Sequence, residues 1–320
     1  MTDGTGYISA DLMRAIPRIS HGRAVSEEGI APLAIQPRKW YNGSVAKGTF
    51  MYDAKLPNRT ILNTHSQRKV LGRLDCPAAV SSVFALEVIR TCPKHRSAYA
   101  NRTFVTLLEA VGGPPMVQAL LNVARLHEQT VVECTRPPIK PSLLKKLADH
   151  DLNDYERCER QGSLEPVVTA TAILNNGFDP THEPFLHQKV TQIVESQLSK
   201  LRHGRFPLPE SAFALGLADP TGTLPPGTVC LLGSVPGLLG SSEQDALLYR
   251  HPGLHPGDIR RVRIVTPTPE LACHLLGADG QACAVIFSTR GDRSLADECS
   301  GGDLDGDDFL LCWQTDLVHA

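Results

Sequence analysis

The sequence predicts an α+β protein in which two small β-barrels are bridged by helices. Blocks of short strands at both ends of the chain, and a helical middle third between them, are the observations that predict it. With 320 residues, 42% of them hydrophobic, the chain is long enough to bury at least one full core, and its length favours two domains.

The first block, residues 1–96, consists of short strand-like runs broken by Gly, Pro and Asn, as in "LAIQPRKWYNGSVAKGTFMYD" and "NRTILNTHSQRKVLG". This texture is typical of a β-barrel. The period then changes over residues 97–204, where "PPMVQALLNVARL" begins with prolines suited to a helix start. In "EPFLHQKVTQIVESQLSKLRHG" one helical face carries Leu186, Val190, Ile193, Val194, Leu198 and Leu201 before the stop signal Gly204. The middle third is therefore predicted to be a helical connector.

Strands return over residues 205–320, in "GTVCLLGSV", "GDIRRVRIV", "ACAVIFS" and "DFLLCW". Loops rich in Gly and Pro separate them, among them "HPGLHPG", in which His255 and Asp258 are expected to shape a turn by local hydrogen bonds. A loop crowded with aspartates leads directly into the last strand, and Asp308 is interpreted as the polar entry to that strand.

Composition excludes several classes of protein. No run of about 18 apolar residues occurs and the N-terminus lacks a signal-peptide pattern, so neither membrane insertion nor secretion is indicated. The nine cysteines form no C-x-x-C pair, which argues against a zinc knuckle and favours a reducing, intracellular compartment. Residues 1–96 hold 14 Lys and Arg against 7 Asp and Glu, whereas residues 292–308 hold seven acids and one base. This asymmetry suits a polyanion held beside a cation site.

The aspartate-rich stretch "GGDLDGDD" contains the spacing D-x-D-G-D at Asp303, Asp305 and Asp307. Carboxylates this close repel one another unless a cation neutralises them, and Gly306 lets the backbone bend so that they aim inward. An EF-hand calcium loop is unlikely, because its sixth and twelfth positions would hold Asp308 and Gln314 instead of Gly and Glu. The spacing therefore favours magnesium, with a solvated acidic turn as the simpler alternative.

Beyond the spacing, "SGGDLDGDDFLLCW" resembles the catalytic signature of the cellular RNA-dependent RNA polymerases of RNA silencing, of the eukaryotic, fungal type. The segments "TDGTGYIS", "IQPRKWYNGSVAKG", "HSQRKV", "ADPTGTLPPGTV", "YRHPGLHPGDIRRVRIV" and "FSTRGDRSLADECSGG" resemble further family segments in the family's order. The loop is similar, more distantly, to the aspartate loop in the largest subunit of multisubunit DNA-dependent RNA polymerases. The matches run from residue 2 to residue 318.

The resemblance implies two double-psi β-barrels joined by a helical connector. The domains would be a lysine-bearing first barrel at 1–96, the connector at 97–204, and a second barrel with the D-x-D-G-D loop at 205–320. Full enzymes of this family have further regions on both sides, so the chain is expected to be the catalytic centre of a longer polymerase, a truncated gene product or a degenerate paralogue.

The resemblance also implies the metal site. Asp303, Asp305 and Asp307 would be catalytic and would hold Mg²⁺, with Mn²⁺ as a possible substitute, for two-metal phosphoryl transfer to the 3′ hydroxyl of the growing RNA.

Three basic residues complete the expected site. By the same resemblance Lys47 and Lys69 would be catalytic and substrate-binding, since a triphosphate needs fixed cations, and Arg250 would lie near the ribose of the incoming nucleotide. We therefore expect Lys47 and Lys69 to face Asp305.

The expected function is RNA-templated RNA synthesis, making double-stranded RNA for gene silencing and short interfering RNA. Its partners would be a single-stranded RNA template, ribonucleoside triphosphates and product RNA, with silencing-pathway proteins as further candidates and no membrane. The expected location is the nucleus or the cytoplasm. Two alternatives stay open: a DNA-templated RNA polymerase of the same barrel type, and a truncated, non-catalytic nucleic-acid-binding remnant.

Overall fold

The computed structural model describes residues 4–16, 18–20, 23–25, 30–41, 43–70, 84–149, 165–234 and 243–320. The chain folds into two compact units that do not follow chain order. The first combines residues 1–96 with 210–314, and the second combines 97–209 with 315–320. Both strand blocks belong to the first unit, so the three-part domain division expected from the sequence stays a prediction.

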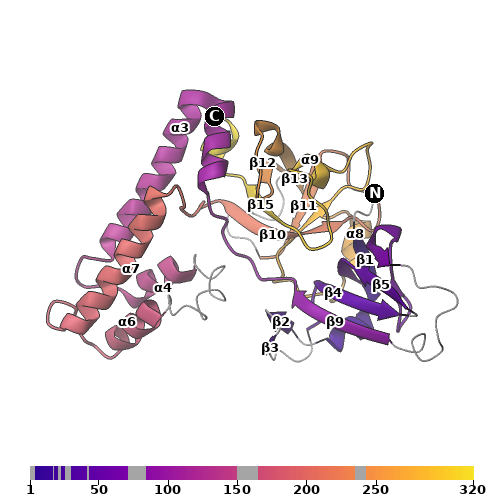
Figure 1. The fold of residues 1–320 in the computed structure, drawn as a ribbon, viewed down its shortest axis with the longest axis horizontal. Helices are drawn as coiled ribbons and strands as arrows, with labels where there is room; N and C mark the ends of the chain where they lie inside the picture. Colours follow the sequence, from indigo (N-terminus) through magenta and orange to yellow (C-terminus); the bar gives the residue numbers. More distant parts are fainter. Residues whose placement is uncertain are drawn as a thin grey trace. The chain divides into compact units, whose positions relative to one another are not determined.

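The N-terminal strands of the first unit form one seven-stranded sheet (Figure 1). Its order is β7-β1-β6-β4-β5-β8, with β9 paired to β4, and β1 runs parallel to β6 while the other pairs are antiparallel. The strands are β1 (Thr5–Ser9), β4 (Ala34–Tyr41), β5 (Ser44–Lys47), β6 (Thr49–Asp53), β7 (Ile61–Leu62), β8 (Arg68–Val70) and β9 (Phe84–Thr91). Over the described residues this sheet is not a closed barrel.

Smaller elements accompany this sheet. The strands β2 (Arg18–Ser20) and β3 (Arg23–Val25) pair with each other in a separate hairpin. A short helix, α1 (Ala10–Arg14), follows β1, and a 3-10 turn, η1 (His65–Gln67), precedes β8.

The C-terminal strands of the same unit close into a six-stranded barrel, β10-β14-β11-β13-β12-β15. Two of its pairs, β10 with β14 and β11 with β13, are parallel. The strands are β10 (Ser211–Ala218), β11 (Thr228–Leu232), β12 (Gln244–Tyr249), β13 (Arg260–Val265), β14 (Ala284–Phe287) and β15 (Asp308–Cys312). The α+β class with a closed barrel is confirmed. The four strand runs expected from the sequence contain β11, β13, β14 and β15. The other two strands of the barrel, β10 and β12, were not predicted.

Alternation explains why β13 lies in the barrel wall. In "RRVRIV" the side chains of Val262 and Ile264 are buried in the core. The neighbouring arginines, Arg261 and Arg263, are exposed, which is the period of two of a half-buried strand. Between the strands lie the 3-10 turn η2 (Pro256–Asp258) and the helices α8 (Pro269–His274) and α9 (Leu295–Glu298).

The turn in "HPGLHPG" forms as the sequence predicts. The Asp258 carboxylate accepts hydrogen bonds from the backbone N–H groups of Leu254 and His255, and the His255 ring accepts one from Gly257 N–H. The structural role expected of His255 and Asp258 is confirmed.

The second unit is helical. Its elements are α3 (Arg102–Glu133), α4 (Pro141–Asp149), α6 (Glu165–Asn175), α7 (Pro184–Arg202) and α10 (Thr315–Val318). The apolar face expected on α7 is confirmed: Leu186, Val190, Ile193 and Val194 are buried in a core shared with the other helices, and Leu198 packs against it. Pro184 stands in the first turn, after Glu183, whose carboxylate caps the helix by accepting from Leu186 N–H.

The helix α3 is interrupted at Gly113, where φ is 59°, so two helical segments meet at a kink beside Pro114 and Pro115. By length and composition α3 is apolar enough to span a membrane, and 33% of its most apolar stretch is buried. Core helices of soluble proteins have the same composition, so this property does not by itself indicate a membrane span.

Candidate active site

The acidic loop, residues 302–307, connects the segment after α9 to β15 within the first unit. Gly301 and Gly306 adopt positive φ angles of 62° and 135°, which side chains disfavour. Leu304 is buried in the barrel core, and the carbonyl of Asp307 accepts a hydrogen bond from Gly216 N–H on β10 at 2.9 Å. The loop is therefore fixed to the barrel at two points: at Leu304, which lies between the predicted metal ligands Asp303 and Asp305, and at the backbone of Asp307.

Within the loop the three aspartates lie close together. Asp303 N–H donates to the Asp307 carboxylate at 3.0 Å, and Asp305 N–H donates to that of Asp303 at 3.3 Å. Burial, followed by the negative charges of Asp305 and Asp307, raises the pKa of Asp303 to about 6. Both causes disfavour the charged form of Asp303, so a cation beside it would stabilise the carboxylate.

Two lysines from the N-terminal sheet face the loop. The ammonium of Lys47 lies 3.1 Å from the Asp305 carboxylate, and that of Lys69 lies 3.7 Å from the same oxygen. Lys47 ends β5 and Lys69 lies on β8, and these strands pair antiparallel. The expectation that both lysines face Asp305 is confirmed, although their catalytic roles stay a prediction.

A buried glutamine positions the lysine-bearing strands. Gln67, fully buried, donates from its side-chain amide to the carbonyls of Gly4 at 3.1 Å and Thr49 at 3.0 Å. A β-carbon at Gly4, whose φ is 102°, would lie 2.7 Å from that of Asp305. Gly4, the first glycine in "TDGTG", is thus required for the close approach of the start of β1 to the acidic loop.

Arg250, which follows β12, points at the loop instead of into open space. Its guanidinium lies 2.6 Å from one oxygen of the Asp307 carboxylate and donates to the other at 3.2 Å, and it also donates to the Ser300 carbonyl. This is a bidentate, charge-assisted pair. The structure therefore brings Arg250 together with the predicted metal ligands, and its contact with a ribose stays a prediction.

The other side of the loop is held by residues that the sequence did not single out. Arg90 on β9 donates to both oxygens of the Asp308 carboxylate, at 2.8 and 3.2 Å, and to the Gly306 carbonyl. Gln36 on β4 donates to the Asp305 carbonyl at 3.1 Å, and Arg96 lies 3.5 Å from Asp308. Asp308 begins β15 as expected and is also an anion that anchors the loop. No local pattern distinguishes these residues from ordinary strand positions, because their partners are more than 200 positions away.

The carboxylates are the ligand type that a hard divalent cation prefers, and the raised pKa of Asp303 fits a site that requires a positive charge. Among the described residues, however, no three His, Cys, Asp or Glu side chains are arranged to hold a metal ion. The Asp305 carboxylate contacts the two lysines and that of Asp307 contacts Arg250. The donor chemistry thus fits a metal, while the three side chains share one loop without converging on one point.

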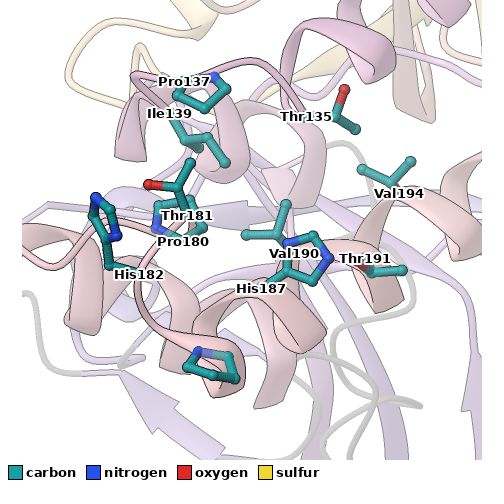
Figure 2. A pocket seen from close by; sticks show the side chains of 11 residues that line it. Thr135, Pro137, Ile139, Pro180, Thr181, His182, His187, Val190, Thr191 and Val194 are labelled. Atoms are coloured by element: carbon teal, nitrogen blue, oxygen red, sulfur yellow. The ribbon is translucent and has the colours of Figure 1, made fainter.

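The helical unit contains a pocket that is an alternative candidate site (Figure 2). It has a volume of about 740 Å³ and is lined by Thr135, Pro137, Ile139, Pro180, Thr181, His182, Pro184, His187, Val190, Thr191 and Val194. The described lining contains two imidazoles but no acidic or permanently basic side chain. Its described lining offers neither carboxylates for a divalent metal nor fixed cations for phosphate, so the acidic loop is the stronger candidate.

Comparison with known proteins identifies the family. The family model described as "RNA dependent RNA polymerase" matches residues 1–320. The chain belongs to the RNA-dependent RNA polymerase family. It is 33% identical over 341 residues to "Probable RNA-dependent RNA polymerase 3" of Arabidopsis thaliana, and 30% identical over 332 residues to "Probable RNA-dependent RNA polymerase 5" of the same plant. Each alignment covers 99% of this chain and 31% of the relative, so the chain spans about a third of their length.

A solved structure shares the fold of this chain. It is the "RNA dependent RNA polymerase QDE-1 from Thielavia terrestris", with a TM-score of 0.72 and 23% sequence identity. The superposition covers 99% of this chain and 34% of that one. At this identity the likeness supports the fold, and the assignment to the family depends on the family model and the plant relatives.

Proposed function

We propose that this chain is the catalytic core of an RNA-templated RNA polymerase that makes double-stranded RNA for gene silencing. The observation that carries the proposal is a contact between the N-terminal sheet and the acidic loop of the closed barrel. The ammonium groups of Lys47 and Lys69, on two strands of that sheet, lie within 4 Å of the Asp305 carboxylate. Metal-binding carboxylates beside fixed cations are the combination that transfer of a nucleotide from a triphosphate requires.

In this proposal Asp303, Asp305 and Asp307 hold Mg²⁺, which Mn²⁺ can replace. When bound, the metal makes the 3′ hydroxyl of the growing RNA more nucleophilic and neutralises phosphate charge. Lys47 and Lys69 would bind the triphosphate oxygens as point charges.

Arg250 is proposed to contact the ribose of the incoming nucleotide. Its guanidinium lies 2.6 Å from Asp307, so a ribose held beside that aspartate would be within reach of its N–H donors. A donor to the 2′ hydroxyl distinguishes ribonucleotides from deoxyribonucleotides.

The fold is proposed to be a pair of double-psi β-barrels. The closed barrel supports this through its two parallel pairs, β10 with β14 and β11 with β13, among antiparallel ones, and the N-terminal sheet contains the parallel pair β1 with β6. The proposed partners are single-stranded RNA template, ribonucleoside triphosphates, product RNA and silencing-pathway proteins. The proposed location is intracellular, in the nucleus or the cytoplasm.

The test is ribonucleotide incorporation by the purified chain on a single-stranded RNA template with Mg²⁺ or Mn²⁺. Asp307→Ala should reduce the rate at least about 100-fold, the scale for removing one preorganised charged group from an active site. Asp292→Ala, which removes an exposed carboxylate upstream of the loop, is the matched control and should retain activity.

Full activity in Asp307→Ala would contradict the proposal. Faster extension on a DNA template of the same sequence would favour DNA-templated RNA synthesis instead. Metal binding without any incorporation would favour a non-catalytic remnant.

A further inference from the structure

A group of three side chains contacts the backbone of the acidic loop and does not contact the Asp305 carboxylate that the two lysines face. This group, called the Arg90 cluster, comprises Gln36 on β4, Arg90 on β9 and Asp308 at the start of β15. Arg90 uses all three of its guanidinium nitrogens: one donates to the Gln36 amide oxygen at 2.9 Å, one to Asp308 at 2.8 Å, and the third to Asp308 and to the Gly306 carbonyl.

The Arg90 cluster holds backbone atoms of the loop directly. Gln36 donates to the carbonyl of Asp305, and Arg90 donates to the carbonyl of Gly306. These two consecutive carbonyls lie between the side chains of Asp305 and Asp307. Fixing both carbonyls restricts the rotation of the peptide units that aim the two carboxylates.

The local geometry is built for this contact. The pairing of β4 with β9 is irregular at this contact: Gln36 pairs with Arg90 but Pro37 pairs with Val88, so β9 has one extra residue next to Arg90. Such bulges re-aim side chains. A β-carbon on Gly306, whose φ is 135°, would overlap the Gln36 amide nitrogen. The glycine of D-x-D-G-D therefore serves the close approach of Gln36 as well as the bend of the loop.

A lysine could not replace Arg90 in this arrangement. Its single ammonium cannot reach the Gln36 oxygen, the two Asp308 oxygens and the Gly306 carbonyl at once, whereas the planar guanidinium fork presents donors in three directions. Arg90 and Asp308 are also largely buried, with side chains 23% and 15% exposed, so solvent screens their pair less than a surface ion pair.

We propose that the Arg90 cluster positions the acidic loop, holding its backbone so that Asp305 and Asp307 present their carboxylates to a divalent cation. This inference rests on the proposed function for the purpose of the loop. Gln36 and Arg90 are positioning residues, because they contact the loop backbone and Asp308 and none of the three predicted metal ligands' carboxylates. Outer residues of this kind orient the ligands of a metal, and their loss weakens metal binding by about 10–100-fold.

The experiment compares the 320-residue chain with Arg90→Gln, Arg90→Lys and Gln36→Ala. Amide hydrogen exchange is followed in a peptide covering residues 300–309, and Mn²⁺ binding is measured by electron paramagnetic resonance without template or nucleotide. Arg263→Gln is the matched control, since it removes an arginine from exposed ion pairs with Glu243 and Asp245 on the same barrel.

Arg90→Gln should speed exchange in the loop peptide about tenfold and weaken Mn²⁺ binding by about 10–100-fold, and Arg90→Lys should not restore either property. Gln36→Ala should also speed exchange in the loop peptide and weaken Mn²⁺ binding, by smaller factors. If Arg90→Gln does not fold, Gln36→Ala tests the proposal in its place. Loop exchange and Mn²⁺ affinity within about twofold of the parent chain in the folded variants, or full rescue by Arg90→Lys, would overturn the proposal. Loop exchange does not depend on turnover, so a parent chain that incorporates no ribonucleotide would contradict the proposed function and leave this test intact.

Discussion

Cations meet carboxylates at two places in and next to the acidic loop, called here the front, at Asp305, and the back, at Asp308. At the front, Lys47 and Lys69 reach Asp305 with side chains that are 52% and 45% exposed, each through a single point contact. At the back, Arg90 is 23% exposed and meets Asp308 with two hydrogen bonds. The Asp305 carboxylate is itself only 10% exposed, but its lysine partners are half exposed and solvent screens their charges. The Arg90 pair, largely buried on both sides and hydrogen-bonded, is the more costly one to break.

This difference in exposure between the lysines and Arg90 indicates which cations are available to a substrate. The front lysines are half exposed, so a substrate anion can reach their ammonium groups, while the Arg90 guanidinium at the back is held by hydrogen bonds within the fold. We therefore expect changes at the front to alter activity with little effect on stability, and changes at the back to alter the shape and stability of the loop.

The largest effect is expected at the front. Replacing both Lys47 and Lys69 by Met, which keeps length and removes charge, should lower ribonucleotide incorporation at least about 100-fold because two fixed cations for the triphosphate are lost. The free energy of unfolding should fall by only about 1 kcal/mol per lysine, because the lysines are half exposed and screened by solvent, although the Asp305 carboxylate that they leave is buried. Incorporation assays and urea unfolding measure the two quantities.

Lys55→Met is the control for this double variant, because Lys55 is an exposed lysine of the same unit. Should the double variant lose stability and activity together, the contrast between front and back would be wrong.

A change at the back should act on stability. Gly306→Ala would place a methyl group onto the Gln36 amide and strain a backbone at φ 135°, so the free energy of unfolding should fall by about 2–3 kcal/mol. Gly227→Ala is a matched control: Gly227 also has a positive φ, of 75°, but nothing lies within 4 Å of the added atom. It should cost about 1 kcal/mol from backbone strain alone, and equal losses in the two variants would show that Gln36 yields easily.

Between the two sides, Asp303 should give a small effect that depends on pH. Burial and its acidic neighbours raise the pKa of Asp303 to about 6 in the folded chain. The unfolded chain therefore loses this proton first, and the folded state becomes less stable as pH rises from about 4 to about 6. Asp303→Asn should be more stable than the parent chain above pH 6, by on the order of 1 kcal/mol once solvent screening is allowed for, and the advantage should vanish below about pH 4.

Urea unfolding across this pH range, without divalent metal, measures the difference. Asp292→Asn, which changes an exposed carboxylate upstream of the loop, is the control variant. A difference between Asp303→Asn and the parent chain that is the same at all pH values would contradict the raised pKa.

Local patterns were sufficient for much of the fold. The α7 face, the arginine-valine alternation of β13 and the hydrogen-bonded turn at His255 and Asp258 are each encoded within a few neighbouring residues, so they could be predicted. The strand β10, "SAFALGLA", is apolar on both faces and lacks alternation, which is why period alone did not reveal it.

The sequence by itself determined the chemistry of this protein: three aspartates at D-x-D-G-D spacing, two lysines in matched contexts, and an α+β architecture. The resemblance already predicted that Lys47 and Lys69 face Asp305, and the structure confirms it. Only the tertiary structure decided the partners of the arginines: it paired Arg250 with Asp307, and Arg90 with Asp308 across 218 positions of sequence. The physical reason is that periodicity specifies which face of a strand is buried, whereas the partner of a buried charge depends on how two sheets close on one another.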